Sequence, residues 1–133
     1  MLKKRKNILI LGGSSDIGIS LIKRLDTKNY NIGAHCFKGK SRLTKYKNKI
    51  TILEKNLDTQ KKCFQLINQY KKKFGLPDIL INLVGEIGNT LDWRKISEKD
   101  FENIIRINLN SAIFMSQKIF ENMKKNKYGK FIF

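Results

Sequence analysis

The chain has 133 residues, of which 41% are hydrophobic, enough for one domain with its own core; this excludes a disordered composition. No apolar run approaches the length of a membrane span, and the N-terminus lacks the long apolar region of a secretory signal, so the sequence predicts a cytoplasmic protein. Cys36 and Cys63 have no metal-ligand spacing, and we expect two reduced, buried thiols and no metal site.

The formal net charge of +17 is concentrated early in the chain, where residues 1–50 hold 13 Lys and Arg against 2 Asp and Glu. Such basicity suits a nucleic-acid partner. However, Lys outnumbers Arg by 23 to 5, whereas base readout favours Arg, and no recognised nucleic-acid motif is present. We therefore expect lysines on solvated faces rather than specific nucleic-acid binding.

A short apolar run over residues 7–11 leads into a glycine turn, after which apolar residues recur at helical spacing. The turn consists of Gly12, Gly13, Ser14, Ser15, Asp16, Ile17 and Gly18. A strand that enters a helix in this way leaves backbone N–H groups free at the positive end of the helix dipole, which suits phosphate. The strict Gly-x-Gly-x-x-Gly spacing is absent, so an ordinary strand-to-helix turn remains the alternative.

Strands and helices are predicted to alternate along the rest of the chain. The expected strands cover residues 30–37, 50–53, 78–85 and 130–133, and the expected helices cover residues 17–29, 59–74 and 97–124. Residues 38–49 are polar and basic, with room for a short helix at most. The apolar face of the last helix includes Phe101, Ile104, Ile105, Leu109, Ile113 and Phe120.

This alternation, with strands that are almost wholly apolar, predicts an α/β fold. We expect a Rossmann-type, doubly wound parallel sheet covered on both faces, in a single domain over residues 1–133. In such a sheet the ligand lies at the carboxyl ends of the strands, where the strand order reverses. The glycine turn and the turn at residues 84–85 should flank that crevice.

Three segments together resemble the short-chain dehydrogenase/reductase (SDR) family. The glycine turn is similar to the family's Thr-Gly-x-x-x-Gly-Ile-Gly cofactor loop, with Leu11 in place of threonine and Asp16 in place of the middle glycine. Residues 78–85 resemble the family's Asp-x-Leu-Val-Asn-Asn-Ala-Gly segment, and residues 107–109 resemble the helix segment that carries the asparagine of the catalytic tetrad. The resemblance covers essentially the whole chain. It implies a homo-oligomeric oxidoreductase that transfers hydride between a nicotinamide cofactor and a small-molecule carbonyl or alcohol.

The resemblance also implies roles for individual residues. It places Gly12, Ser14, Ser15, Asp16, Ile17 and Gly18 at the pyrophosphate, Asn56 and Leu57 at the adenine, and Asn82, Val84 and Gly85 beside the ribose and nicotinamide. Asn108 matches the catalytic asparagine. Asn56 stands where the family has an aspartate, and its carbonyl oxygen can still accept from the adenine amino group. A non-catalytic nucleotide-binding module or regulator is the alternative function.

The choice of cofactor is read at the end of the second strand, where NAD binding calls for Asp or Glu. Residues 35–42 contain no acid and three basic residues. We therefore expect NADP(H) rather than NAD(H), with Lys38 at the 2′-phosphate and Arg42 as second choice; surface lysine in a lysine-rich chain is the alternative. Residues 34–41 also fit a loose P-loop pattern, but the bulky His35 and Phe37 lie in the expected strand, which argues against an NTPase.

The proton-donor motif of the resembling family, Tyr-x-x-x-Lys, does not occur in the chain. Four residues after its tyrosines stand Ala34, Ile50, Phe74 and Ile132. In the family this motif follows the fifth strand, and the chain ends inside that strand, so the expected sheet is truncated there. We therefore expect the 133-residue chain to bind a dinucleotide without oxidoreductase turnover of its own.

Overall fold

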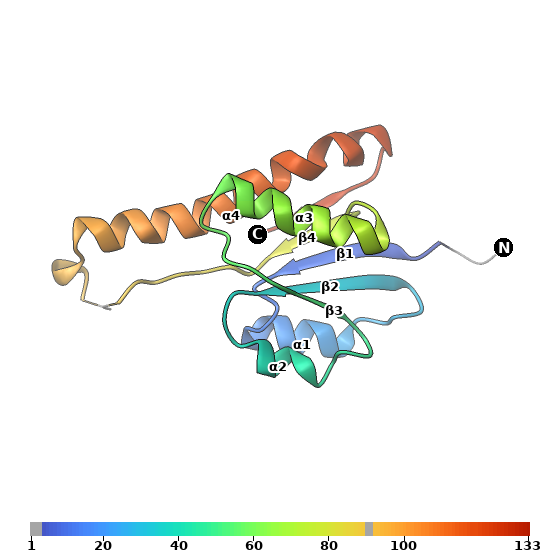
Figure 1. The fold of residues 1–133 in the computed structure, drawn as a ribbon, viewed down its shortest axis with the longest axis horizontal. Coiled ribbons are helices and arrows are strands. Elements are labelled where there is room, and N and C mark those ends of the chain that lie inside the picture. The colour runs from blue at the N-terminus through green and yellow to red at the C-terminus, as the bar shows by residue number, and fades with distance from the viewer. Residues whose placement is uncertain (1–3, 90–91) are drawn as a thin grey trace.

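The computed structural model describes residues 4–89 and 92–133, and its sheet has five parallel strands. The strands are β1 (Lys6–Leu11), β2 (Tyr30–Cys36), β3 (Thr51–Glu54), β4 (Ile79–Asn82) and β5 (Lys130–Ile132). Their order is β3-β2-β1-β4-β5, so the chain starts in the middle of the sheet and winds first to one edge and then to the other (Figure 1). The predicted doubly wound α/β fold is confirmed, although β4 ends at Asn82 rather than at residue 85.

Helices cover both faces of this sheet. They are α1 (Asp16–Arg24), α2 (Lys40–Thr44), α3 (Gln60–Phe74) and α4 (Glu98–Lys125), with a short 3₁₀ helix, η1 (Trp93–Lys95), before α4. In Figure 1, α1 and α2 lie on one side of the sheet and α3 and α4 on the other. Within the described residues, no helix is both long and apolar enough to cross a membrane.

The end of α1 differs from the prediction, which extended this helix to residues 28–29. The helix ends at Arg24, because Leu25 has extended backbone angles and Asp26 organises the next turn. The Asp26 side chain accepts from the Lys28 N–H (2.8 Å), and its carbonyl accepts from the Tyr30 N–H (3.1 Å). A short polar side chain that bonds nearby backbone competes with helix, and here it starts β2.

Alternation along the central strand divides the core into two layers. Ile8 and Ile10 of β1 pack with α1 and α2, whereas Leu9 and Leu11 pack with α3 and α4. Both cysteines are buried free thiols, as expected, one in each layer. The apolar side chains of each strand are therefore used on both faces, as the parallel sheet requires.

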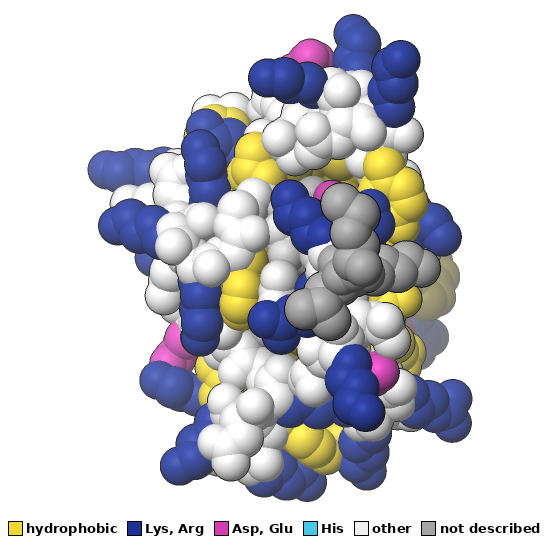
Figure 2. Space-filling model, turned by 90° about the vertical axis from the view of Figure 1, so that its right-hand side faces the viewer, with side chains coloured by type: hydrophobic (Ala, Val, Ile, Leu, Met, Phe, Trp, Pro, Cys, Tyr) yellow, Lys and Arg dark blue, Asp and Glu magenta, His cyan; other side chains and the backbone are white. Residues whose placement is uncertain are grey.

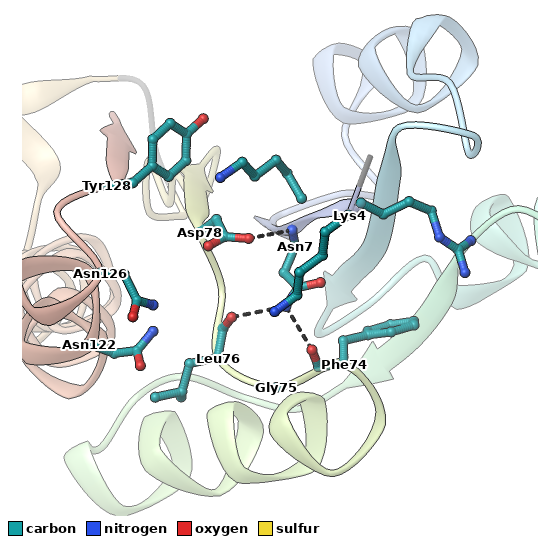
Figure 3. Close-up of a pocket in the computed structure, with 11 residues that line it drawn as sticks. Lys4, Asn7, Phe74, Gly75, Leu76, Asp78, Asn122, Asn126 and Tyr128 are labelled. Carbon is teal, nitrogen blue, oxygen red and sulfur yellow. Dashed lines mark hydrogen bonds between the residues drawn. The ribbon is translucent and has the colours of Figure 1, made fainter. Parts of the chain in front are cut away.

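The amino ends of the strands are joined by the buried side chain of Asn7. Its Nδ2 donates to the carbonyls of Phe74 (2.6 Å) and Leu76 (3.2 Å), and its Oδ1 accepts from the Asn31 amide (2.9 Å). The Asn7 backbone N–H donates to Asp78 Oδ2 (2.9 Å), as Figure 3 shows. These bonds hold β1, β2 and the end of α3 together at the amino ends of the strands, which is the end of the sheet opposite the glycine turn. Figure 2 views the side near the N-terminus, where Lys and Arg side chains are spread over the surface.

Helix α4 does not bury the apolar face that the sequence suggested. The side chains that face the protein are Ser111, Met115, Ile119 and Met123. Five residues of the expected face are instead 42–57% exposed: Phe101, Ile105, Leu109, Ile113 and Phe120. The helix is apolar on two sides, and the packed side is the one that carries Ser111, Met115, Ile119 and Met123. We call these five exposed residues the α4 stripe.

Candidate functional site

A cleft of about 450 Å³ opens at the carboxyl ends of β1, β2 and β4, the predicted place for a ligand. Nine residues named from the sequence line it: Gly12, Ser14, Ser15, Lys38, Arg42, Asn56, Leu57, Val84 and Gly85. Asp16, Ile17, Gly18, Asn82 and Asn108 do not line it. The fold thus brings segments more than 70 residues apart in the sequence to one opening.

The glycine turn is packed so closely that side chains are excluded from it. Gly12 has φ +69°, and a Cβ there would lie 2.7 Å from the carbonyl oxygen of Leu83. A Cβ on Gly18 would lie 2.5 Å from the carbonyl oxygen of Gly13. The Gly13 N–H in turn donates to the His35 carbonyl (2.7 Å). Because the glycines of this turn carry no side chain, α1 can start directly against the end of β1 and beside β2.

The start of α1 offers unpaired backbone donors. Ser15 caps the helix, because its hydroxyl accepts from the Gly18 N–H (3.1 Å), and the Ser15 N–H donates to the Gly12 carbonyl (3.0 Å). Within the described residues, the N–H groups of Asp16 and Ile17 make no hydrogen bond. Such N–H groups at the positive end of a helix dipole attract an anion. The site therefore has two donors for a phosphate oxygen.

Three basic side chains follow β2, and two of them are already paired with acids. Arg42 forms an exposed ion pair with Asp16, and its guanidinium lowers the pKa of that carboxyl. Lys40 forms an ion pair with Glu54 (2.8 Å), which raises the pKa of Lys40. Lys38 has no carboxylate partner within the described residues. Its charge at the mouth of the cleft is thus the one left for a ligand.

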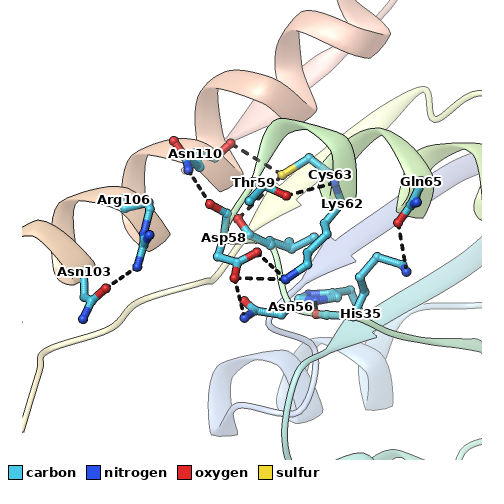
Figure 4. Close-up of polar contacts among 12 residues, drawn as sticks. His35, Asn56, Asp58, Thr59, Lys62, Cys63, Gln65, Asn103, Arg106 and Asn110 are labelled. Carbon is cyan, nitrogen blue, oxygen red and sulfur yellow. Dashed lines mark hydrogen bonds and ion pairs between the residues drawn. The ribbon is translucent and has the colours of Figure 1, made fainter.

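Asn56 lines the cleft, and within the described residues its carbonyl oxygen makes no hydrogen bond. Its Nδ2 donates to Asp58 Oδ2 (2.9 Å), and Asp58 is held by an ion pair with Lys62 (2.8 Å). The Asp58 carbonyl accepts from the Asn110 amide of α4 (2.9 Å), as Figure 4 shows. These contacts fix Asn56 through its amide nitrogen. Leu57 is 3% exposed and supplies an apolar wall.

Asn82, the last residue of β4, and Asn108 of α4 bond neighbouring protein groups and do not line the cleft. Asn82 Nδ2 donates to Ser111 Oγ (3.2 Å), and Asn82 Oδ1 accepts from the Val84 N–H (3.1 Å). Asn108 accepts from the Glu86 N–H (2.8 Å) and donates to the Glu86 carbonyl (3.0 Å). Both amide ends of Asn108 are therefore used to hold the segment after β4. In this arrangement the two asparagines position residues 84–86 along one wall of the cleft.

Sequence reasoning missed several residues of the cleft, among them His35, Cys36 and Glu86. His35 is the only histidine and is 3% exposed. Burial lowers the pKa of His35, opposed by its hydrogen bond to the Lys55 carbonyl. Burial also raises the pKa of the Cys36 thiol, with Glu54 adding to the effect. The signal available for His35 was a histidine in the largely apolar second half of β2, at the start of the segment predicted to select the cofactor.

Comparison with known proteins shows what the chain is similar to. The family model for short chain dehydrogenase matches residues 6–133. The 3-oxoacyl-[acyl-carrier-protein] reductase FabG of Buchnera aphidicola subsp. Schizaphis graminum is 28% identical over 133 residues, covering 97% of this chain and 54% of the relative. The FabG of Buchnera aphidicola subsp. Baizongia pistaciae is 43% identical over 61 residues, 46% of this chain and 24% of the relative.

Solved structures share the fold. Levodione reductase superposes with a TM-score of 0.80 at 16% identity, covering 95% of this chain and 52% of that chain. The chain therefore spans about half the length of the first curated relative and of this structure.

Proposed function

We propose that this chain, which belongs to the short-chain dehydrogenase family, supplies the dinucleotide-binding part of an oxidoreductase that transfers hydride between a nicotinamide cofactor and a carbonyl or alcohol. The observation that carries the proposal is the pair of unpaired N–H groups at Asp16 and Ile17. They lie at the start of α1, beside a cleft that Lys38 borders. A dinucleotide pyrophosphate needs such donors and a turn without side chains.

The residues present fit this cofactor. The pyrophosphate would lie over the glycine turn (Gly12, Ser14, Ser15, Asp16, Ile17 and Gly18), the adenine near Asn56 and Leu57, and the nicotinamide end beside Asn82, Val84 and Gly85. When bound, the nicotinamide supplies the hydride acceptor or donor. The chain's own residues bind and orient it, and Asn108 supports the wall next to its reactive end. We propose one dinucleotide-binding domain over residues 1–133.

We further propose a preference for NADP(H) over NAD(H). Residues 35–42 carry no acid for a ribose 2′-hydroxyl, and Lys38 has no acidic partner within the described residues. A 2′-phosphate beside Lys38 would gain a charge-assisted contact that NAD(H) cannot make. Arg42 is the weaker candidate, because Asp16 already offsets its charge.

The relatives named 3-oxoacyl-[acyl-carrier-protein] reductase suggest the substrate. We propose a 3-oxoacyl thioester carbonyl as substrate of the whole enzyme. We also propose that the α4 stripe is a contact between copies in a homo-oligomer, since about half of each of its five side chains is exposed. A hydrophobic row of this kind on a helix is typical of protein interfaces.

The direct test of cofactor binding is titration of the purified chain with NADPH and with NADH. Binding is measured by calorimetry and, for NADPH, by fluorescence. We expect saturable binding of NADPH with one site per chain, and weaker binding of NADH. A folded chain that binds neither dinucleotide would overturn the proposal.

A further inference from the structure

His35 lies in β2 and connects the glycine turn to β2 and to the end of β3, through both its backbone and its ring. Its carbonyl accepts from the Gly13 N–H (2.7 Å), and its Nδ1 accepts from the Gly12 N–H (3.2 Å). Its Nε2 lies 2.7 Å from the carbonyl oxygen of Lys55, just beyond β3. Figure 4 shows the ring among these elements, below Lys62 and beside Asn56. The imidazole is thus a buried link between β3 and the turn that ends β1.

These partners determine the protonation of the ring. The Lys55 carbonyl can only accept, so Nε2 must carry a hydrogen. The Gly12 N–H can only donate, so Nδ1 must be bare. Only the neutral imidazole with hydrogen on Nε2 satisfies both contacts. A proton on Nδ1 would set a donor against a donor at the glycine turn.

We propose that His35 is a positioning residue for the dinucleotide: its neutral ring holds the Gly12 amide, and a proton on Nδ1 weakens dinucleotide binding. The inference rests on the proposed function. The Gly12 carbonyl bonds the Ser15 N–H, and Ser15 caps the helix whose first N–H groups are open to phosphate. The turn packs closely against the segment after β4, since a Cβ on Gly12 would lie 2.7 Å from the Leu83 oxygen. Protonation therefore breaks a contact that sets the phosphate donors.

The ring of His35 hydrogen-bonds only backbone groups within the described residues, and several charged side chains near it are paired with one another. The titratable groups that belong to the glycine turn, line the cleft with His35 or lie on the neighbouring segments are Asp16, Cys36, Lys38, Arg42, Glu54, Lys55, Asp58, Lys62, Tyr70 and Glu86, and Asp16 pairs with Arg42. Asp58 pairs with Lys62, Glu54 pairs with Lys40, and the Lys55 ammonium lies 3.4 Å from Gln65 Oε1. Burial is the dominant influence on the pKa of His35, and it favours the neutral ring.

The test compares NADP⁺ binding by wild type, His35→Gln and His35→Ala from pH 5 to pH 8, using calorimetry. NADP⁺ is used because it withstands acid. His35→Gln serves as the matched control because Gln also offers N–H donors and an oxygen acceptor but does not titrate. The 2′-phosphate titrates near pH 6. Its contribution cancels in the ratio of wild-type to His35→Gln affinity at each pH. Because the chain has one histidine, the imidazole gives a single set of NMR signals for its tautomer and titration.

We expect wild-type affinity, relative to His35→Gln, to fall with a slope that approaches tenfold per pH unit below the pKa of His35. Saturation with NADP⁺ should lower that pKa, and the nitrogen shifts should report hydrogen on Nε2. At pH 7.5, Gln should bind within about threefold of wild type, and Ala at least tenfold more weakly.

Other outcomes separate the two proposals. Parallel pH profiles for wild type and His35→Gln that extend below the pKa of His35 read by NMR, or hydrogen on Nδ1 of the free protein, would overturn the positioning role alone. No NADP⁺ binding by folded wild type at any pH would overturn the dinucleotide function and the positioning role together. If His35→Ala does not fold, the wild-type and His35→Gln profiles and the NMR titration still test the positioning role.

Discussion

A side chain at Gly18 should block the phosphate site, and the structure gives the size of the effect. A Cβ at this position would lie 2.5 Å from the Gly13 oxygen and 2.7 Å from two Gly13 carbons. Ordinary contact begins at 3.4 Å, so α1 and the turn must separate by about 0.9 Å. The atoms that must move are backbone, which is held by the Gly13 N–H bond to His35 (2.7 Å). Gly18→Ala and Gly18→Val therefore strain the turn in increasing degree.

Two free-energy terms follow from this displacement. Overpacking of this kind costs about 1–3 kcal/mol of folding free energy. The displaced helix start also misdirects the N–H groups of Asp16 and Ile17, and a hydrogen bond to a charged group is worth about 1.5–3 kcal/mol. Losing one such bond weakens affinity about tenfold to a hundredfold. We expect at least tenfold weaker NADPH binding for Gly18→Ala and no measurable binding for Gly18→Val.

The assay is NADPH fluorescence titration, with urea unfolding to measure stability. Ser20→Val is the matched control, because Ser20 lies exposed on the same helix and the substitution adds only the lower helix propensity of valine. We expect this control to bind NADPH as the wild type does. A folded Gly18→Val variant with wild-type affinity would show that the phosphate does not bind at this turn.

Three further predictions concern the cofactor preference, the sheet and the α4 stripe. Lys38→Glu should weaken NADPH binding at least tenfold and change NADH binding less than threefold, whereas Lys28→Glu, exposed away from the cleft, should change neither; equal losses for both cofactors would refute the 2′-phosphate contact. Asn7→Ala should lower the free energy of unfolding in urea by about 2–4 kcal/mol, because buried carbonyls lose their donor; a loss below about 1 kcal/mol would contradict this. Ile113→Glu should reduce the mass measured by light scattering, and Gln117→Glu on the same helix should not; unchanged mass in both would remove the stripe as an interface.

The sequence predicted the strands and most helix boundaries because these depend on local signals. Gly75 ends α3 with φ +81°, and Ser97 begins α4 by accepting from the Asp100 N–H, both as their residue types indicate. The predicted end of α1 was wrong because the turn at Asp26 competes with the helix. The buried face of α4 was wrong because spacing alone cannot choose between two apolar sides of one helix.

The site divides in the same way. Residues of the cleft that follow a strand could be named from the sequence, since parallel strands end at one edge of the sheet. The partners of the polar side chains could not, because they come from distant segments. Asn108 bonds the backbone of Glu86, and His35 bonds Gly12 across 23 residues. Tertiary contacts of this kind leave no periodic pattern in a single sequence.

Under the proposed function, the cleft combines two recognition elements that respond differently to substitution. The phosphate donors are backbone groups whose direction depends on packing at Gly12, Gly18 and His35, so substitutions there should affect both dinucleotides equally. The proposed 2′-phosphate contact depends on Lys38, an exposed side chain. Loss of this side chain should affect only NADP(H), and the contact itself should weaken with salt. A salt titration of wild type with both cofactors separates these elements. NADPH affinity should approach NADH affinity as ionic strength rises, because the added charge is screened while the turn geometry remains.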